Sequence, residues 1–147
     1  MRAPFQILAI PYRFDGVDVM FAALKRSDDG YWQGVAGGGD LGETPLQAAI
    51  RECYEEVGVG SQSKVLSLKS QASVSVEHFS ARSQWPVDLF VIPEYCFALN
   101  CTGEELLLSD EHTDLHWGSY ESIKAILHWD SNKTALWELH CRLSRSN

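Results

Sequence analysis

The sequence has few cysteines and no long run of apolar residues. Its four cysteines form no C-x-x-C pair, so their spacing predicts neither a zinc site nor a disulfide framework, and we expect reduced thiols. The apolar stretch at residues 5–10 is far too short to span a membrane, and it lacks the longer hydrophobic region of a signal peptide. We therefore expect a cytoplasmic protein without a membrane partner.

Basic residues are also scarce, because 12 lysines and arginines face 20 aspartates and glutamates and leave a formal net charge of −8. Nucleic acid is therefore not an expected partner, since phosphate backbones require basic surfaces. A small polyphosphate remains compatible with an acidic protein if metal ions stand between the two negative charges. The expected partner is accordingly a small molecule.

Internal repeats, low-complexity tracts and linkers are absent, so the 147 residues are interpreted as one domain, 1–147. Hydrophobic residues make up 45% of the chain, which is enough for a sizeable core. Strands are expected at 5–12, 17–24, 31–35, 65–76, 89–99 and 115–117. Helices are expected at 45–57, 121–127 and 132–143. Mixed in this order, these elements predict an α/β fold with a mixed sheet packed between helices.

The helix expected at 45–57 has the clearest local signals. Thr44 is predicted to be the N-cap of a capping box, and Gly58 is predicted to end the helix in a left-handed conformation. Two other segments are expected to be irregular. The glycines at 37–39 are predicted to form a loop with accessible backbone, and 78–86 is predicted to be an exposed loop.

The same helix carries three glutamates, Glu52, Glu55 and Glu56, whose i, i+3 and i+4 spacing places them on one face. Like charges this close repel one another, and Arg51 can relieve only part of the repulsion. A divalent cation would neutralise the cluster, and hard cations such as Mg²⁺ prefer carboxylate oxygens. The spacing alone is more typical of a solvated helix face, so a metal site needs support from the surrounding sequence.

That support comes from the residues around the helix. From Gly37 the chain reads as glycine, five residues, glutamate, seven residues, and then R-E-C-Y-E-E-V-G-V. This pattern resembles the signature of the Nudix hydrolases, G-x5-E-x7-R-E-U-x-E-E-x-G-U, where U is aliphatic, and every fixed letter matches. With residue frequencies of about 7%, the odds of a chance match are on the order of one in a million. The departure is Cys53 at an aliphatic position, where a free cysteine packs as a small hydrophobe.

The resemblance implies a Nudix-type α/β/α sandwich and a hydrolase that uses Mg²⁺, with Mn²⁺ as an alternative. Metal ions that bridge a diphosphate cancel its charge and lower the pKa of bound water. The metal ligands that it implies are one backbone carbonyl and four carboxylates, from Gly37, Glu52, Glu55, Glu56 and Glu111.

Catalytic roles are expected for Glu52, Glu55, Arg51 and Glu111. By resemblance, Arg51 orients the glutamates through salt bridges, and Glu43 braces the glycine segment against the helix. The general base is expected to be either Glu111, from a loop outside the signature, or Glu52. Asp110 is the nearest rival of Glu111.

Substrate contacts are expected close to the glycines. Trp32 and Gln33 offer a stacking plane and an amide, which suit a flat heterocycle. Lys25, at the end of a strand, and Gly38, whose backbone permits close approach, are expected to meet phosphates.

The C-terminal part supplies a further resemblance. Residues 129–133 are similar to the tail of bacterial dihydroneopterin triphosphate pyrophosphatases, a Nudix subgroup also labelled dATP pyrophosphohydrolases. This implies that Asn132 or Trp129 faces the ring of the substrate. The alternative is that Ser131 or Asp130 merely caps the last helix.

The predicted function is Mg²⁺-dependent hydrolysis of a pyrophosphate linkage in a nucleoside-triphosphate-like molecule, with dihydroneopterin triphosphate or dATP favoured and pyrophosphate released. One alternative is a Nudix hydrolase acting on another nucleoside-diphosphate-linked metabolite. Another is a non-catalytic Nudix-like ligand-binding module, which would be free to lose the glutamates that this chain keeps. A purely structural cation site would not explain why Gly37 and Glu43 stand at the sequence positions that the Nudix signature requires.

Overall fold

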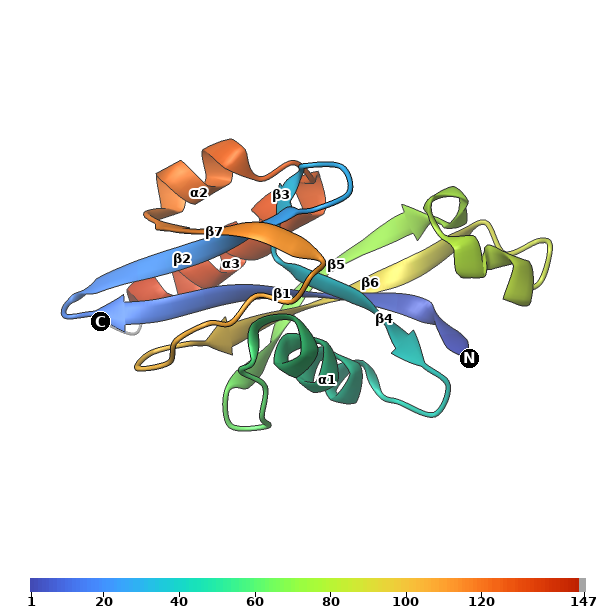
Figure 1. The fold of residues 1–147 in the computed structure, drawn as a ribbon, viewed down its shortest axis with the longest axis horizontal. Coiled ribbons are helices and arrows are strands. Elements are labelled where there is room, and N and C mark those ends of the chain that lie inside the picture. The colour runs from blue at the N-terminus through green and yellow to red at the C-terminus, as the bar shows by residue number, and fades with distance from the viewer. Residues whose placement is uncertain (146–147) are drawn as a thin grey trace.

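The computed structural model describes residues 1–145, whose strands form a single seven-stranded sheet (Figure 1). The strands are β1 (Arg2–Asp15), β2 (Asp18–Arg26), β3 (Trp32–Gln33), β4 (Val35–Asp40), β5 (Val65–Ser75), β6 (Val91–Asn100) and β7 (His112–Gly118). Their main order is β3-β2-β1-β6-β5, with β4 paired to β1 and β7 paired to β2. Strands β1 and β6 are parallel and the other pairs are antiparallel, so the sheet is mixed, as predicted.

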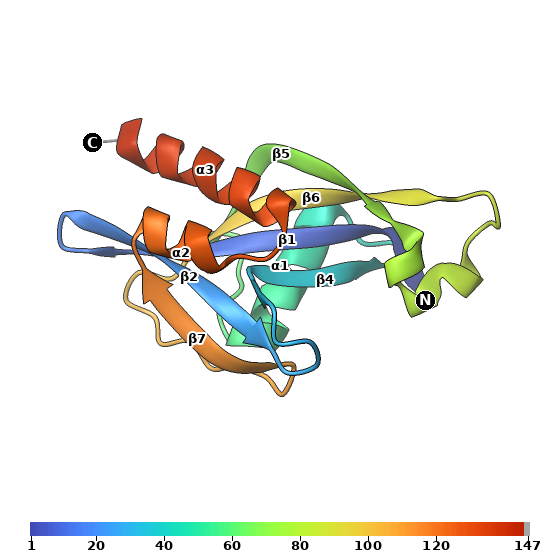
Figure 2. The same ribbon diagram turned by 90° about the horizontal axis from the view of Figure 1, so that it is seen from above.

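Three α-helices cover the two faces of the sheet (Figure 2). They are α1 (Pro45–Val57), α2 (Tyr120–Ile126) and α3 (Asp130–Arg145). Helix α1 packs in one hydrophobic core with Ile7 and Ala9 of β1, whereas α2 and α3 pack in a second core with Leu8 and Ile10. Successive strand residues point to opposite faces, so the continuous apolar residues 7–10 of β1 contribute alternately to the two cores. The predicted α/β/α sandwich is confirmed.

Helix α1 begins and ends where its local signals predict. The backbone N–H of Gln47 donates to Thr44 Oγ1 at 3.2 Å, and Gln47 Oε1 accepts from the backbone N–H of Thr44 at 2.9 Å, which completes the capping box. Gly58 follows the helix with φ of 78°, a left-handed conformation in which glycine has no steric penalty. These end contacts set the bounds of α1, whose buried residues are Ala48, Ala49, Cys53, Glu56 and Val57.

The prediction that the glycines at 37–39 form a loop is wrong, because all three lie in strand β4. Gly37 pairs with Ile7 and Gly38 pairs with Gln6 of β1. Glycine has low strand propensity, so the sequence alone favours a loop. The pairing with β1 is a long-range contact that overrides this preference.

The segment at 78–86 is also more ordered than an exposed loop. The short 3-10 helix η1 (Val76–His78) ends at the first residue of this segment, the 3-10 helix η2 (Ser80–Gln84) lies within it, and the segment contacts Arg2 near the start of β1. Ala81 is buried there, and the indole Nε1–H of Trp85 donates to the carbonyl of Arg2 at 3.1 Å. The prediction of an exposed loop agrees with the exposure of most of its residues, but Phe79 and Trp85 attach the segment to Arg2 of β1.

Two further differences concern strand and helix bounds. The strand expected at 31–35 is split at Gly34, whose backbone N–H donates to the side-chain Oδ1 of Asn132 at 2.8 Å. The strand expected at 115–117 extends over all of β7. None of the helices within residues 1–145 is long and apolar enough to cross a membrane.

Candidate active site

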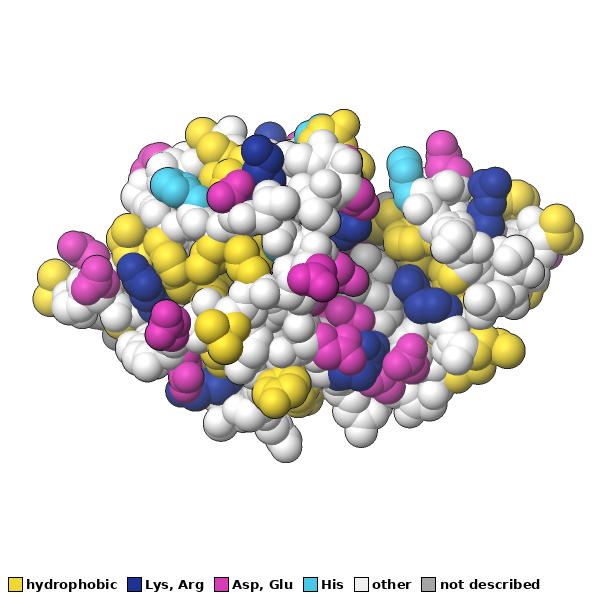
Figure 3. Space-filling view, in the orientation of Figure 1, with side chains coloured by type: hydrophobic (Ala, Val, Ile, Leu, Met, Phe, Trp, Pro, Cys, Tyr) yellow, Lys and Arg dark blue, Asp and Glu magenta, His cyan; other side chains and the backbone are white. Residues whose placement is uncertain are grey.

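The glutamates of α1 face the glycine strand β4, and acidic side chains gather in the middle of this face of the molecule, between β7 and α1 (Figure 3). The carboxylate of Glu52 occupies the space where a Cβ atom at position 37 would lie. Only glycine at this position leaves room for it. The Gly37 and Glu52 of the signature are thus brought into contact.

Arg51 connects the helix to the strand and to the turn between them. Its guanidinium binds Glu43 through two bonds, from Nε at 2.8 Å and from Nη2 at 2.9 Å. Nη1 donates to Glu52 at 2.9 Å and to Glu55 at 3.2 Å, while Nη2 also donates to the carbonyl of Gly38 at 2.8 Å. These contacts raise the pKa of Arg51, chiefly through Glu43, and Arg51 in turn lowers the pKa of Glu43. The geometry supports the predicted orienting role of Arg51.

Glu56 differs from its two neighbours because it is buried, with only 2% of its surface exposed. Neither of its carboxylate oxygens has a hydrogen-bond partner within the described chain. Burial is the main cause that raises its pKa to about 10, followed by its interaction with Glu111. A buried carboxylate without a partner is costly when charged, so this group requires either a proton or a cation.

The other carboxylates act on one another as well. Burial raises the pKa of Glu52, the Arg51 hydrogen bond opposes that effect, and the charges of Glu55 and Glu111 add to the rise. Glu55 is the most exposed of the three helix glutamates, with 55% of its side chain accessible. Repulsion among these groups is what a bound divalent cation would relieve.

Glu111 reaches this cluster through the loop that precedes β7. The backbone N–H of Ser109 donates to the carbonyl of Glu56 at 3.0 Å, which ties the loop to the end of α1. The carbonyl of Glu111 accepts from the backbone N–H of Ser27 at 2.9 Å. Glu111, rather than its rival Asp110, acts on the pKa of both Glu52 and Glu56. The predicted loop carboxylate therefore lies beside the helix glutamates.

Over residues 1–145, no three acidic, histidine or cysteine side chains are already close enough together to hold a metal ion. The donor chemistry nevertheless fits a hard cation, because the oxygens on offer are carboxylates and two of them, on Glu56, lack any partner. Glu52 and Glu55 form ion pairs with the Arg51 guanidinium, so their carboxylates lie next to Arg51.

The residues predicted to bind substrate lie on β2, β3, β4 and α3. Lys25 pairs across the sheet with Trp32, and the Trp32 ring packs edge-on against His116. Gln33 is buried, and Asn132 is buried with its Oδ1 bound to Gly34. The carbonyl of Gly38 is occupied by Arg51. Their contacts with substrate stay predictions.

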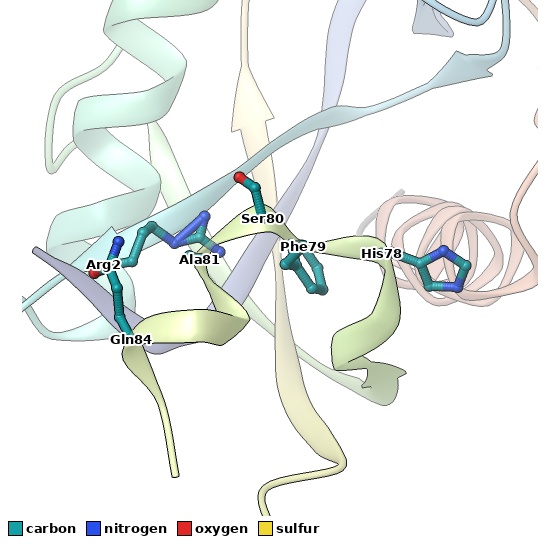
Figure 4. A pocket seen from close by; sticks show the side chains of 6 residues that line it. All are labelled: Arg2, His78, Phe79, Ser80, Ala81 and Gln84. Carbon is teal, nitrogen blue, oxygen red and sulfur yellow. The ribbon is translucent and has the colours of Figure 1, made fainter. Parts of the chain in front are cut away.

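A cavity that the sequence did not reveal lies beside β4, with a volume of about 330 Å³. Its lining residues are Arg2, His78, Phe79, Ser80, Ala81 and Gln84 (Figure 4). The guanidinium of Arg2 lies over Gly38 and within 5.5 Å of the centre of the Phe79 ring. Its Nε is buried and has no hydrogen-bond partner among residues 1–145. Burial lowers the pKa of Arg2, while the charge of Glu52 raises it.

Arg2 and this cavity escaped prediction because no motif marks them. Arg2 stands alone before the first strand, and the cavity forms only when η1 and η2 fold onto it. An aromatic cluster extends the same surface, since the ring of His78 lies 6.2 Å from the half-exposed Trp129. Trp129 also packs edge-on against Tyr31 at 5.9 Å. Ring contacts thus run from Trp129 to the cavity that holds Arg2, and the charge of Glu52 acts on Arg2.

The sandwich fold and the contacts within the signature define a hydrolase of the Nudix type. The family model of the NUDIX domain matches residues 6–137, and the chain belongs to this family. It is therefore an enzyme that acts on pyrophosphate bonds, in a family that typically uses a divalent metal ion and nucleotide-like substrates.

Individual relatives are similar over nearly the whole chain. Dihydroneopterin triphosphate diphosphatase of Escherichia coli K12 is 31% identical over 137 residues, which cover 92% of this chain and 91% of the relative. A crystal structure from Listeria monocytogenes, described as that of a NUDIX hydrolase, has a TM-score of 0.87 and 44% identity, with 98% and 97% of the two chains covered. The structure of the E. coli dihydroneopterin triphosphate pyrophosphohydrolase has a TM-score of 0.75 and 25% identity, with 95% and 97% covered.

Proposed function

We propose that this protein, acting as one domain of residues 1–147, hydrolyses dihydroneopterin triphosphate and releases pyrophosphate, with dATP as the second choice of substrate. The observation that carries this proposal is the 31% identity to the E. coli diphosphatase over 92% of the chain. The ring contacts that join Trp129 to the cavity of Arg2, and the charge of Glu52 acting on Arg2, support it. A flat heterocycle suits the aromatic end at Trp129, and a triphosphate suits the end that holds Arg2.

In this proposal Mg²⁺, or Mn²⁺ in its place, is held by carboxylates of Glu52, Glu55, Glu56 and Glu111 and by the carbonyl of Gly37. When bound, the cation neutralises the diphosphate and lowers the pKa of water at the site. The partnerless oxygens of Glu56 are the observation that favours this arrangement.

Side chains of the protein are proposed to transfer the proton and to position the glutamates. Glu111 accepts the proton of the attacking water, with Glu52 as the alternative base. The water oxygen bonds to phosphorus, the anhydride P–O bond breaks, and pyrophosphate leaves. Arg51 keeps the glutamates in place, as its hydrogen bonds to Glu52 and Glu55 allow.

Substrate recognition is proposed to involve both predicted and newly found groups. Lys25 and Gly38 meet the phosphates, and Arg2 adds a positive charge beside Gly38. Trp32, Gln33 and Asn132 are proposed to recognise the heterocycle, as the sequence predicts.

The test is a comparison of kcat/KM for dihydroneopterin triphosphate, dATP, ADP-ribose and diadenosine polyphosphate in the presence of Mg²⁺, with pyrophosphate release measured directly. Dihydroneopterin triphosphate should give the highest value. A tenfold preference for ADP-ribose or diadenosine polyphosphate, about 1.4 kcal/mol in transition-state binding, would overturn the substrate assignment and leave the catalytic residues unaffected. Absence of hydrolysis on all four would count against the catalytic proposal for these substrates.

A further inference from the structure

His112 is buried beside Glu56, and the catalytic proposal gives His112 no role. The His112 side chain is completely buried, and neither Nδ1 nor Nε2 has a hydrogen-bond partner in the described structure. Its Nε2 lies 3.9 Å from Oε1 of Glu56, whose two oxygens are equally without partners. Buried polar groups are normally hydrogen-bonded, so two adjacent groups that both lack a bond require an explanation.

The backbone aims His112 at this position. In the pairing of β7 with β2, Lys25 lies opposite Asp114, but the next residue, Arg26, lies opposite His112. Thr113 is therefore an extra residue, which makes a β-bulge, and it is exposed while His112 is buried. A bulge re-aims the side chains that flank it, and such features occur next to active sites. Without the bulge, Thr113 would take the inward position.

The loop before β7 also holds the backbones of His112 and Glu56 close together. Leu107 donates its backbone N–H to the carbonyl of Val57 at 2.9 Å, and Ser109 donates to the carbonyl of Glu56 at 3.0 Å. The backbone N–H of His112 donates to the carbonyl of Ser109 at 3.2 Å. His112 and Glu56 are thus attached to one hydrogen-bonded unit, which cannot separate without breaking these bonds.

We propose that His112 is a positioning residue for the metal ligand Glu56: its Nε2–H donates to one carboxylate oxygen and so holds the other oxygen toward the bound divalent cation. This inference rests on the proposed function, because it needs Glu56 as a ligand. A small side-chain rotation would close the 3.9 Å gap to hydrogen-bond distance. Groups that orient metal ligands commonly change metal affinity by about 10- to 100-fold when removed.

The test measures Mn²⁺ affinity of the full chain by electron paramagnetic resonance, together with thermal unfolding in EDTA. His112→Leu should weaken Mn²⁺ binding about 10- to 100-fold without lowering the unfolding temperature in EDTA, because it removes an unpartnered polar group from the interior. His112→Gln places an amide nitrogen near the position of Nε2 and should restore affinity to within about threefold. Thr113→Val, at the exposed neighbouring position, is the matched control and should bind like the wild type.

A double-mutant cycle between His112 and Glu56, with Mn²⁺ affinity as the measured quantity, gives the most specific test. In a Glu56→Gln background, His112→Leu should produce no further loss of Mn²⁺ affinity, because the positioned group is gone. Equal Mn²⁺ affinity in wild type and His112→Leu, or an equal loss in both backgrounds, would overturn the inference while the proposed hydrolysis stands. A wild type that hydrolyses its substrate undiminished in EDTA would instead overturn the metal mechanism of the proposed function, and this inference with it.

Discussion

The carboxyl group of Glu56 links protonation to folding when no cation is present. Its pKa in the folded chain is about 10, above the ordinary value of 4.5, because burial penalises the charged form. Between these two pH values the folded chain keeps a proton that the unfolded chain has released. The stability contributed by this group is therefore fully present below about pH 4.5 and is lost as the pH rises toward about 10.

We accordingly expect the free energy of unfolding in EDTA to fall between pH 6 and pH 9, and Glu56→Gln to remove most of this fall. The amide cannot ionise, so the variant should be more stable than the wild type at the higher pH. Urea unfolding at several pH values measures the slope. Glu121→Gln, at an exposed position of α2, is the control. An unchanged slope in Glu56→Gln would assign the pH dependence to other groups.

Glu111 is the residue whose proposed role depends on proton transfer. Glu111→Gln should lower kcat by about 10²- to 10⁴-fold if it is the general base. The neighbouring substitution Asp110→Asn should leave kcat within about threefold of wild type, because Asp110 lies on the same loop without acting on Glu52 or Glu56. Steady-state kinetics at saturating Mg²⁺ provides the comparison. A loss of less than about threefold in Glu111→Gln would move the base to Glu52.

At the scale of elements, strand β4 contacts two different side chains through adjacent glycines, Glu52 at Gly37 and Arg2 at Gly38. A Cβ atom at Gly37 would collide with the Glu52 carboxylate, whereas one at Gly38 would collide with the Arg2 guanidinium. Neither glycine has positive φ, so alanine is compatible with the backbone at both positions. The two substitutions therefore separate the metal side of the strand from the side that faces the cavity.

We expect Gly37→Ala to weaken Mn²⁺ binding by about tenfold or more through displacement of a ligand. Gly38→Ala should leave Mn²⁺ affinity near that of wild type and raise KM for the triphosphate, because it displaces Arg2. Each variant is the control for the other, with circular dichroism to verify the fold. The same effect from both substitutions on metal affinity and on KM would indicate a general distortion of β4 instead.

At the scale of the whole molecule, metal binding should increase the free energy of unfolding. A ligand that binds only the folded state stabilises it by RT ln(1 + [L]/Kd), which is about 2.7 kcal/mol at one hundred times Kd. Mg²⁺ should therefore raise the unfolding temperature, and EDTA should reverse the rise. The double variant Glu52→Gln with Glu56→Gln should show no rise, since it lacks two proposed ligands. An equal rise in this variant would mean that the stabilising ion binds elsewhere.

Local signals in the sequence predict some parts of this molecule well. Helix α1 is specified by Thr44 and Gly58 at its ends, and the spacing of its glutamates places them on one face; the sandwich follows from the order of elements. Features that depend on long-range pairing could not be predicted in this way. The glycines enter a strand because β1 pairs with them, and His112 turns inward because of a bulge whose register depends on β2.

Arg2 illustrates the same limit for the cavity proposed to receive substrate. A single arginine before the first strand carries no periodic or motif signal, and its partners Phe79 and Trp85 are about eighty positions away in the sequence. Only the folded 3-10 segment brings them together. The residues of the signature contact one another, as in Gly37 with Glu52 and Arg51 with Glu52, whereas the cavity proposed to receive substrate is built from contacts between distant parts of the chain.

The parallel pairing of β1 with β6 has a consequence for how the protein is made. Gln6 pairs with Glu94, so the central ladder cannot form until about two-thirds of the chain has left the ribosome. Pairings of such high sequence separation form slowly, because the entropy of loop closure is lost before the contacts can compensate. Until then the apolar β1 has only its local partners, β2 and β4, and its other edge is open. Helix α1, which carries the glutamates, and strand β4, which carries the glycines, are synthesised before strand β6, which pairs with the other edge of β1.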